Sequence, residues 1–246
     1  MRTHRHLASV VALIVIALTG SLFVAAPAHA GATPVTIELI QEHTSKKAIY
    51  NDGKGPYLDN LDRVSIAGVV SSGGSPLASK TVTLQRQMKG SDTWTSLGTD
   101  YSDGNGVVQI WDDARGTATY RLVFDGSSDS TYATAYSPDR LVKVMRDLNA
   151  TDVKKDGRLL FKGKVTPKWN KKKIVLERKT SKKGKYKVVK RAKTNKKGKW
   201  SFRLSAPRKG SWYYRAWVPG RNGFVKSYSH IYVETYRTYF RSARSF

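Results

Sequence analysis

The sequence predicts an all-β protein made of two tandem antiparallel β-sandwich domains, placed behind a cleaved signal peptide. Short segments carry apolar residues at every second position, as half-buried strands do. Turns rich in Gly, Ser, Asn and Lys separate these segments every eight to twelve residues or so. The second half of the chain also repeats the first half at a near-constant offset, which indicates two copies of one unit.

The N-terminal segment has the three parts of an export signal. Arg2 and Arg5 give it a positive start, residues 7–26 are apolar, and residues 28–30 (AHA) form a small-x-small cleavage site. The alternative is an uncleaved membrane anchor, because about 20 apolar residues can span a bilayer. Cleavage after Ala30 predicts a mature chain without a transmembrane segment. We expect it to be secreted, and either released or retained non-covalently at the cell surface.

The mature chain divides into two domains. We place a near-neutral domain at 31–146 and a basic domain at 147–240, each close to the common domain size of about 100 residues. A basic-aromatic tail follows at 241–246. The chain has no cysteine, so each domain must be held by its hydrophobic core without disulfides.

Six segments of the first domain recur in the second, in the same order and at an offset of 92 to 95 residues. Residues 82–86 (VTLQR) match 174–178 (IVLER), and residues 119–121 (TYR) match 213–215 (YYR). Chance similarity does not keep order and spacing over six segments, so we infer a tandem duplication.

Alternation within the repeats predicts which side chains face each core. The apolar face of the strand at 118–124 is matched by a second face at 212–218. Residues 41–62 form an insertion in the first domain and are predicted to be a surface loop. Asp112 and Asp113 are predicted to lie in a loop between strands. The two predicted faces are Ala118, Tyr120, Leu122 and Phe124, and Trp212, Tyr214, Ala216 and Val218.

The order of these motifs carries a family resemblance. The succession G-x-V, V-x-L-x-R, an aromatic residue, Y-R and S resembles the tandem bacterial immunoglobulin-like or fibronectin-III-like domains of secreted and cell-surface proteins. That family includes spacers, adhesins and carbohydrate-associated modules, so the resemblance implies a fold but no particular activity. It also implies that Tyr120 or Tyr214 is the buried tyrosine at the start of the sixth strand.

Motifs for catalysis and metal binding are missing from the sequence. The mature chain has two histidines, His43 and His230, without metal-ligand spacing, and it has no G-x-S-x-G elbow. Residues 103–106 (DGNG) could offer oxygens to Ca²⁺, but they lack further carboxylates and fit a hairpin turn better. We therefore expect no enzyme activity, no metal and no cofactor. An enzyme with an unrecognised site remains the alternative.

Charge is the strongest functional lead. Residues 31–146 carry 12 Lys and Arg against 13 Asp and Glu, a net charge of −1, whereas residues 147–246 carry 30 against 5, a net charge of +25. Threading the chain up and down a sandwich brings three basic loops to one end of the second domain. The outward positions of its late strand add two aromatic residues that could stack on sugars or bases. The predicted polyanion-binding residues are Lys171, Lys172, Lys173, Lys196, Lys197, Lys199 and Arg221, with Tyr213 and Trp217 as possible stacking residues.

These observations predict a secreted, non-enzymatic binding or structural protein. Its second domain would bind an anionic cell-wall polymer or an acidic polysaccharide, and its first domain would act as a spacer or partner-binding module. Export argues against a specific nucleic acid as the natural partner. One alternative is a specific adhesin or carbohydrate-binding module that uses loop 41–62 and the exposed aromatics. Another is a lysine-rich surface that serves solubility alone.

Overall fold

The structure of the protein is a computed structural model, and it describes residues 31–41, 58–59, 63–128, 131–155, 158–205, 207 and 209–235. The predicted signal peptide, His43, most of loop 41–62 and the tail at 241–246 lie outside these residues. In the part of the chain that is described, no helix is long and apolar enough to cross a bilayer.

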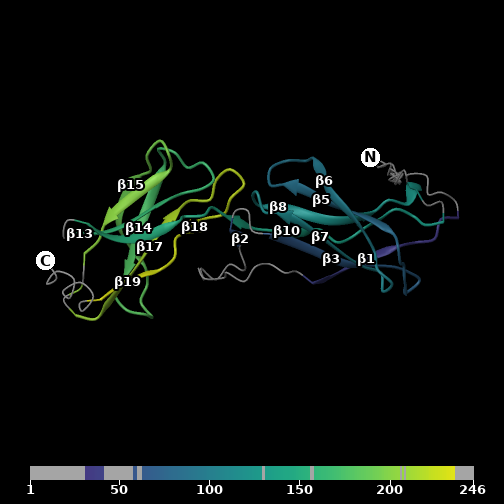
Figure 1. The fold of residues 1–246 in the computed structure, drawn as a ribbon, viewed down its shortest axis with the longest axis horizontal. Coiled ribbons are helices and arrows are strands. Elements are labelled where there is room, and N and C mark those ends of the chain that lie inside the picture. The colour runs from purple at the N-terminus through teal and green to yellow at the C-terminus, as the bar shows by residue number, and fades with distance from the viewer. Residues whose placement is uncertain are drawn as a thin grey trace, which may run out of the picture.

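The predicted all-β fold is confirmed, and the first sandwich consists of two facing antiparallel sheets (Figure 1). In one sheet β3 lies between β1 and β7 and also pairs with β4. The other has the order β10-β8-β5-β6, with β9 also on β8. The strands are β1 (Thr36–Gln41), β3 (Arg63–Ser72), β4 (Ser75–Pro76), β5 (Thr81–Met88), β6 (Trp94–Tyr101), β7 (Val107–Asp113), β8 (Ala118–Phe124), β9 (Ala135–Tyr136) and β10 (Arg140–Val142), and a short 3-10 helix η1 spans Gly126–Ser128.

The second sandwich repeats this arrangement. One sheet has the order β12-β13-β16, and the other has the order β15-β14-β17-β18, with β19 also on β17. Strands β13, β14 and β17 thus take the places of β3, β5 and β8. The strands are β12 (Ala150–Lys155), β13 (Arg158–Lys164), β14 (Lys173–Lys179), β15 (Lys187–Lys193), β16 (Lys199–Arg203), β17 (Ser211–Val218), β18 (Ser227–Tyr228) and β19 (Tyr232–Thr235).

Each sandwich has its own hydrophobic core, and the predicted apolar faces line these cores. Tyr120 and Leu122 of β8 are fully buried in the first core, and Tyr214 and Ala216 of β17 occupy the same places in the second. Trp212 is the exception, since it is half-buried and packs at the margin of the second core. Alternation along a strand therefore predicted the buried faces of both copies.

Both candidate tyrosines are buried, and they are held differently. The Tyr214 hydroxyl donates to the backbone oxygen of Ser205 at 2.7 Å, whereas the Tyr120 hydroxyl donates to Asp112 at 2.9 Å. Arg86 forms an ion pair with the same Asp112 oxygen at 2.6 Å. Burial raises the pKa of Tyr120, and the neighbouring Asp112 carboxylate adds to the effect. The predicted loop position of Asp112 and Asp113 is wrong: both residues end strand β7, because the β3–β7 pairing continues through Val64 opposite Asp112 and Arg63 opposite Asp113.

Two short strands lie at the junction of the sandwiches. Strand β2 (Leu58–Asp59) pairs in parallel with β11 (Val144–Met145), in the segment that leads into the second sandwich. The prediction that 41–62 is entirely a surface loop is therefore wrong at its end. Figure 1 shows the two sandwiches end to end, with β2 between them.

A buried cation holds the junction. The Arg146 guanidinium lies 5.1 Å from the ring centre of Trp169 and 4.2 Å from that of Phe224. It donates to the backbone oxygens of Pro167 and Arg221. Burial lowers the pKa of Arg146, because the charged form has lost its water. Two loops of the second sandwich are thereby tied to the residue that precedes it.

The loop between β17 and β18 also contacts the first sandwich directly. Phe224 packs against the first hydrophobic core although it belongs to the second half of the chain. The Thr117 backbone N–H donates to the Gly223 oxygen at 2.7 Å, and the Val225 N–H donates to the Val144 oxygen at 2.9 Å. The sandwiches are thus docked by apolar contact and by backbone hydrogen bonds.

Candidate polyanion-binding surface

Two of the predicted basic loops meet at one end of the second sandwich. The Lys171 N–H donates to the Asn195 backbone oxygen at 3.2 Å, and the Thr194 N–H donates to the Lys172 oxygen at 2.9 Å. These bonds join the loop between β13 and β14 to the turn between β15 and β16. The structure therefore brings together the lysines at 171–173 and those at 196, 197 and 199.

The turns at 103–106 and 195–198 have the same geometry. The Asp103 side chain accepts hydrogen bonds from the N–H groups of Asn105 and Val107, and Asn195 accepts from those of Lys197 and Lys199, all at 2.8 to 3.0 Å. The one oxygen of each side chain that points inward thus closes its own turn. The described residues contain no group of three or more acidic or histidine side chains that could hold a metal ion.

Arg221 is placed differently from the lysines. Its backbone oxygen accepts a bond from Arg146, so its loop faces the first sandwich while its side chain is exposed. Lys172 is half-buried, with its ammonium group 5.0 Å from the ring centre of Trp169. Because Trp169 also contacts Arg146, this basic end of the second sandwich adjoins the junction, which the sequence did not indicate.

Further cations extend the basic surface along the open side of the sandwich. Edge strands β15 and β16 lie next to each other there, and the Lys190 ammonium group of β15 donates to the Arg203 backbone oxygen of β16. Sequence reasoning did not assign these cations to the surface, because they lie within strands and not in the lysine runs of the loops. Alternation predicts an outward position for Lys162 and Lys164, but it does not predict that the neighbours Lys190 and Arg191 are both exposed. These further cations are Lys162, Lys164, Lys187, Lys190, Arg191, Lys193 and Arg203.

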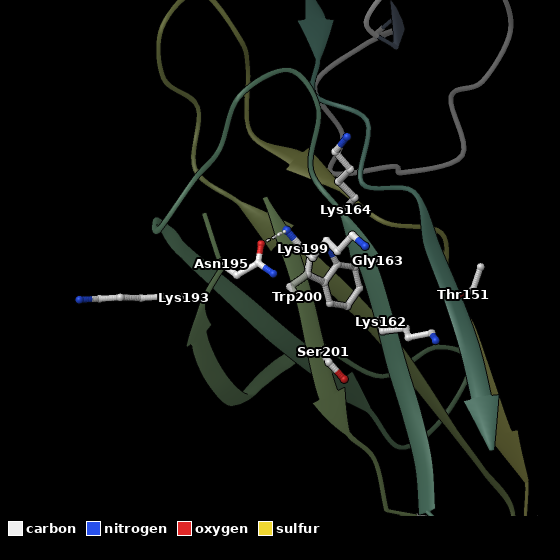
Figure 2. Close-up of a pocket in the computed structure, with 9 residues that line it drawn as sticks. All are labelled: Thr151, Lys162, Gly163, Lys164, Lys193, Asn195, Lys199, Trp200 and Ser201. Carbon is white, nitrogen blue, oxygen red and sulfur yellow. Dashed lines mark hydrogen bonds between the residues drawn. The ribbon is translucent and has the colours of Figure 1, made fainter. Parts of the chain in front are cut away.

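An open hollow of about 590 Å³ lies within this surface (Figure 2). Four lysines line it, and no carboxylate of the described part of the chain does. Trp200, which is 4 % exposed, belongs to its wall, and the indole Nε1 atom has no hydrogen-bond partner among the described residues. The full lining is Thr151, Lys162, Gly163, Lys164, Lys193, Asn195, Lys199, Trp200 and Ser201.

The strand register sets cations directly against cations. Lys164 of β13 faces Lys199 of β16, and Lys173 of β14 faces Lys193 of β15. Further along the same pair of strands, Arg178 faces Lys187. Like charges directly opposite in a sheet destabilise it by a few tenths of a kcal/mol to about 1 kcal/mol. The fold therefore holds these pairs at a cost in stability.

At the equivalent paired positions of the first sandwich, the residues are uncharged. The pair equivalent to Lys164 and Lys199 is Val69 and Val107. Thr81 and Tyr101 stand where Lys173 and Lys193 stand in the second sandwich. The duplicated fold thus does not require cations at these positions.

The carboxylate of Glu177, in the second sandwich, is paired with an arginine away from the hollow. Glu177 of β14 accepts two bonds from Arg215 of β17 at 3.0 Å, on the outer face of the other sheet. The Arg215 guanidinium lies between two rings, 3.9 Å from the centre of Tyr186 and 4.4 Å from that of Tyr228. Burial raises the pKa of the Tyr186 hydroxyl. This carboxylate is therefore not available to neutralise the lysines around the hollow.

The first sandwich contains the same arginine–aromatic arrangement. Arg121 lies 3.9 Å from the ring centre of Trp94 and 4.6 Å from that of Tyr136, and it donates to Gln85 at 3.0 Å. Each residue is the repeat partner of its counterpart around Arg215. The arrangement is therefore a shared structural feature of the two copies.

The two predicted stacking residues lie on that outer face, and both are half-buried. Lys179 places its ammonium group 5.2 Å from the ring centre of Tyr213, and Lys226 lies 4.1 Å from that of Trp217. Four residues separate the rings along β17, which corresponds to about 13 Å. The rings do not gather at the basic loops, and each already has a cation against it.

Comparisons with known proteins leave the family open. No family model and no curated protein matches the chain. Solved structures that resemble it include the chicken interferon gamma receptor alpha chain, with 7% identity, a TM-score of 0.40, and coverage of 69% of this chain and 91% of that one. The D0-D1 domain of intimin has 13% identity, a TM-score of 0.27, and coverage of 73% and 93%. Likenesses this distant say nothing about ligand or activity.

Proposed function

We propose that the protein is a secreted, non-enzymatic binding protein whose second sandwich attaches it electrostatically to an anionic polymer. The polymers we have in view are phosphate-containing cell-wall polymers and acidic polysaccharides. One observation carries the proposal: the strand register opposes cation to cation around a hollow with no carboxylate in its lining, where the first sandwich has apolar and hydroxyl residues.

A solubilising surface does not account for this register. Charge that serves solubility alone is best spread out, because like charges held opposite each other lower the stability of the sheet without adding to solubility. Binding of a polyanion relieves the repulsion, since each bound anionic group lies between cations that otherwise repel. Lysines also favour charge density over a fixed recognition geometry, because their ammonium groups sit on flexible stems.

The test measures retention of the mature chain, residues 31–246, on cell-wall material before and after chemical removal of its phosphate polymers. We expect retention at low salt, release as salt rises, and loss of retention on the stripped material. The variant Lys162→Gln/Lys164→Gln should elute at lower salt than the natural sequence. If both lysines contact the polymer, the slope of log affinity against log salt should fall by about 1.4 to 1.8.

A matched control removes two exposed cations from the first sandwich, as Lys89→Gln/Arg115→Gln. This control should elute close to the natural sequence, because its loss of net charge is the same but removes no cation from the lining of the hollow. Equal effects of the two variants, or no retention at any salt concentration, would contradict the proposal.

A further inference from the structure

We propose that the hollow between β13 and β16 takes one terminal phosphate group of the bound polymer, and that Lys164 and Lys199 clamp it. This inference rests on the proposed function and goes one step further: it assigns a defined subsite and a chemical class of ligand within the basic surface. The groups available in the hollow, their charge and the corresponding positions of the first sandwich support it.

The hollow combines cations that come from separate strands. Lys162 and Lys164 belong to β13, Lys199 begins β16, and Lys193 ends β15. Lys164 and Lys199 are direct cross-strand partners, so their Cβ atoms lie about 5 Å apart. Because both side chains are long and flexible, their two ammonium groups can converge on one anionic group. Figure 2 shows these side chains spreading in different directions around Trp200, with Lys193 extended away from the others.

Neutral donors add direction to this charge. The Asn195 side-chain oxygen accepts the Lys197 and Lys199 N–H groups, which fixes the amide and leaves its NH₂ group as the remaining donor. The Trp200 side chain belongs to the second hydrophobic core, and its indole N–H is buried and without a partner among the described residues, so it serves as a reporter beneath the hollow and not as a donor to the anion. Ser201 and Thr151 add hydroxyl groups to the lining. The site is rich in donors and poor in charged acceptors, which suits an anion whose oxygens point in several directions.

Its charge favours phosphate over carboxylate. A carboxylate brings one negative charge and two oxygens in a plane, whereas a terminal phosphate brings up to two charges and oxygens arranged as a tetrahedron. Four lysines without a carboxylate in the lining are better compensated by the more highly charged group. Charge-assisted hydrogen bonds from ammonium groups to phosphate oxygens are among the stronger polar contacts in proteins.

The first sandwich provides an internal comparison. Asp103 stands where Asn195 stands in the second sandwich, and its carboxylate would repel an anion. Val69 and Val107 replace the clamp lysines, and Val108 takes the place of Trp200. The same fold therefore lacks the subsite when these few positions differ.

The experiment uses NMR on the mature chain labelled with ¹⁵N. The protein has six tryptophans, so six indole N–H signals are expected, and Trp200→Phe identifies the one from Trp200. Inorganic tripolyphosphate is the phosphate probe, and hyaluronate is the carboxylate probe at equal ionic strength. We expect the Trp200 signal to move saturably with tripolyphosphate and to move little with hyaluronate.

Two charge-matched variants locate the effect. Lys164→Gln/Lys199→Gln should lose the Trp200 shift and bind tripolyphosphate at least about tenfold more weakly, since two charge-assisted contacts are removed. Lys182→Gln/Lys183→Gln removes the same charge from the exposed turn between β14 and β15, at the opposite end of the sandwich, and should keep the shift.

The outcomes separate the subsite from the proposed function. Binding of tripolyphosphate that both variants weaken equally, or that moves the Trp169 and Trp217 signals as much as the Trp200 signal, overturns the subsite and leaves the basic surface standing. A response to hyaluronate equal to that for tripolyphosphate overturns the preference for phosphate. Absence of binding to either polyanion at low salt overturns both proposals.

Discussion

Repulsion between Lys164 and Lys199 is measurable in a double-mutant cycle that combines Lys164→Gln with Lys199→Glu. The first change removes one charge of the pair, and the second turns repulsion into attraction. The residues are direct partners across β13 and β16, and their flexible stems allow the ammonium groups to separate to about 8 Å. Two unit charges at that distance in water interact by about 0.5 kcal/mol.

The expected coupling follows from this figure. Replacing a repulsion of about 0.5 kcal/mol by an attraction of similar size gives a coupling of about 1 kcal/mol at 0.01 M salt, where the Debye length is about 30 Å. At 1 M salt the Debye length is about 3 Å, so the coupling should almost vanish. Lys199→Glu alone should therefore stabilise the protein at low salt, although it removes a cation of the proposed clamp.

Urea denaturation of the four proteins at both salt concentrations provides the assay. A coupling of 1 kcal/mol corresponds to a midpoint shift of roughly 0.3 to 1 M urea at unchanged m-value. A coupling of zero at low salt would refute the reasoning, because the two ammonium groups would then not interact. The same coupling at both salt concentrations would refute it too, because the effect would not be electrostatic.

Three further predictions concern the junction, a close contact and a buried tyrosine. Arg146→Met should lower the free energy of unfolding by about 2 kcal/mol in urea titrations, since two backbone oxygens lose a charged donor; exposed Arg115→Met should change it little. Gly163→Ala should lower the melting temperature strongly, because its Cβ would overlap the Asn149 backbone oxygen, whereas Gly98→Ala, with nothing within 4 Å, should leave it nearly unchanged. The raised pKa of Tyr120 means that above pH 10.0 the folded state keeps a proton that the unfolded chain releases. The free energy of unfolding should therefore be insensitive to this group below pH 10 and fall as pH rises above it, and Tyr120→Phe should make that fall shallower.

Periodicity and repeat spacing predicted the long strands at the centre of each sandwich and most of their buried faces. Burial along 118–124 and 212–218 follows the alternation of the sequence, except at Val123, which is also buried, and at Trp212, which is half-buried. The junction was not predictable in this way, because an isolated arginine such as Arg146 resembles any surface cation in sequence. Its burial depends on Trp169 and Phe224, which lie 23 and 78 residues further along the chain.

The basic surface was predicted in part for a similar reason. Lysine runs mark the loops at 171–173 and 196–199, and threading the strands was enough to bring these loops to one end. The opposition of Lys164 to Lys199 depends on the strand register, which alternation does not determine. The register of β14 and β15 also shifts between Leu176 and Glu177. Which cations face each other along these strands therefore cannot be predicted by counting residues from the turn.

Because the two sandwiches are docked at Arg146, the unequal distribution of charge produces a dipole that is fixed relative to both of them. A body with most of its positive charge in one half has a dipole along its long axis, and such a body turns in the field of an anionic surface before it touches it. Because Phe224 packs against the first core, the near-neutral sandwich turns together with the charged one. Attachment by the second sandwich would thus set the orientation of the first sandwich relative to the anionic surface.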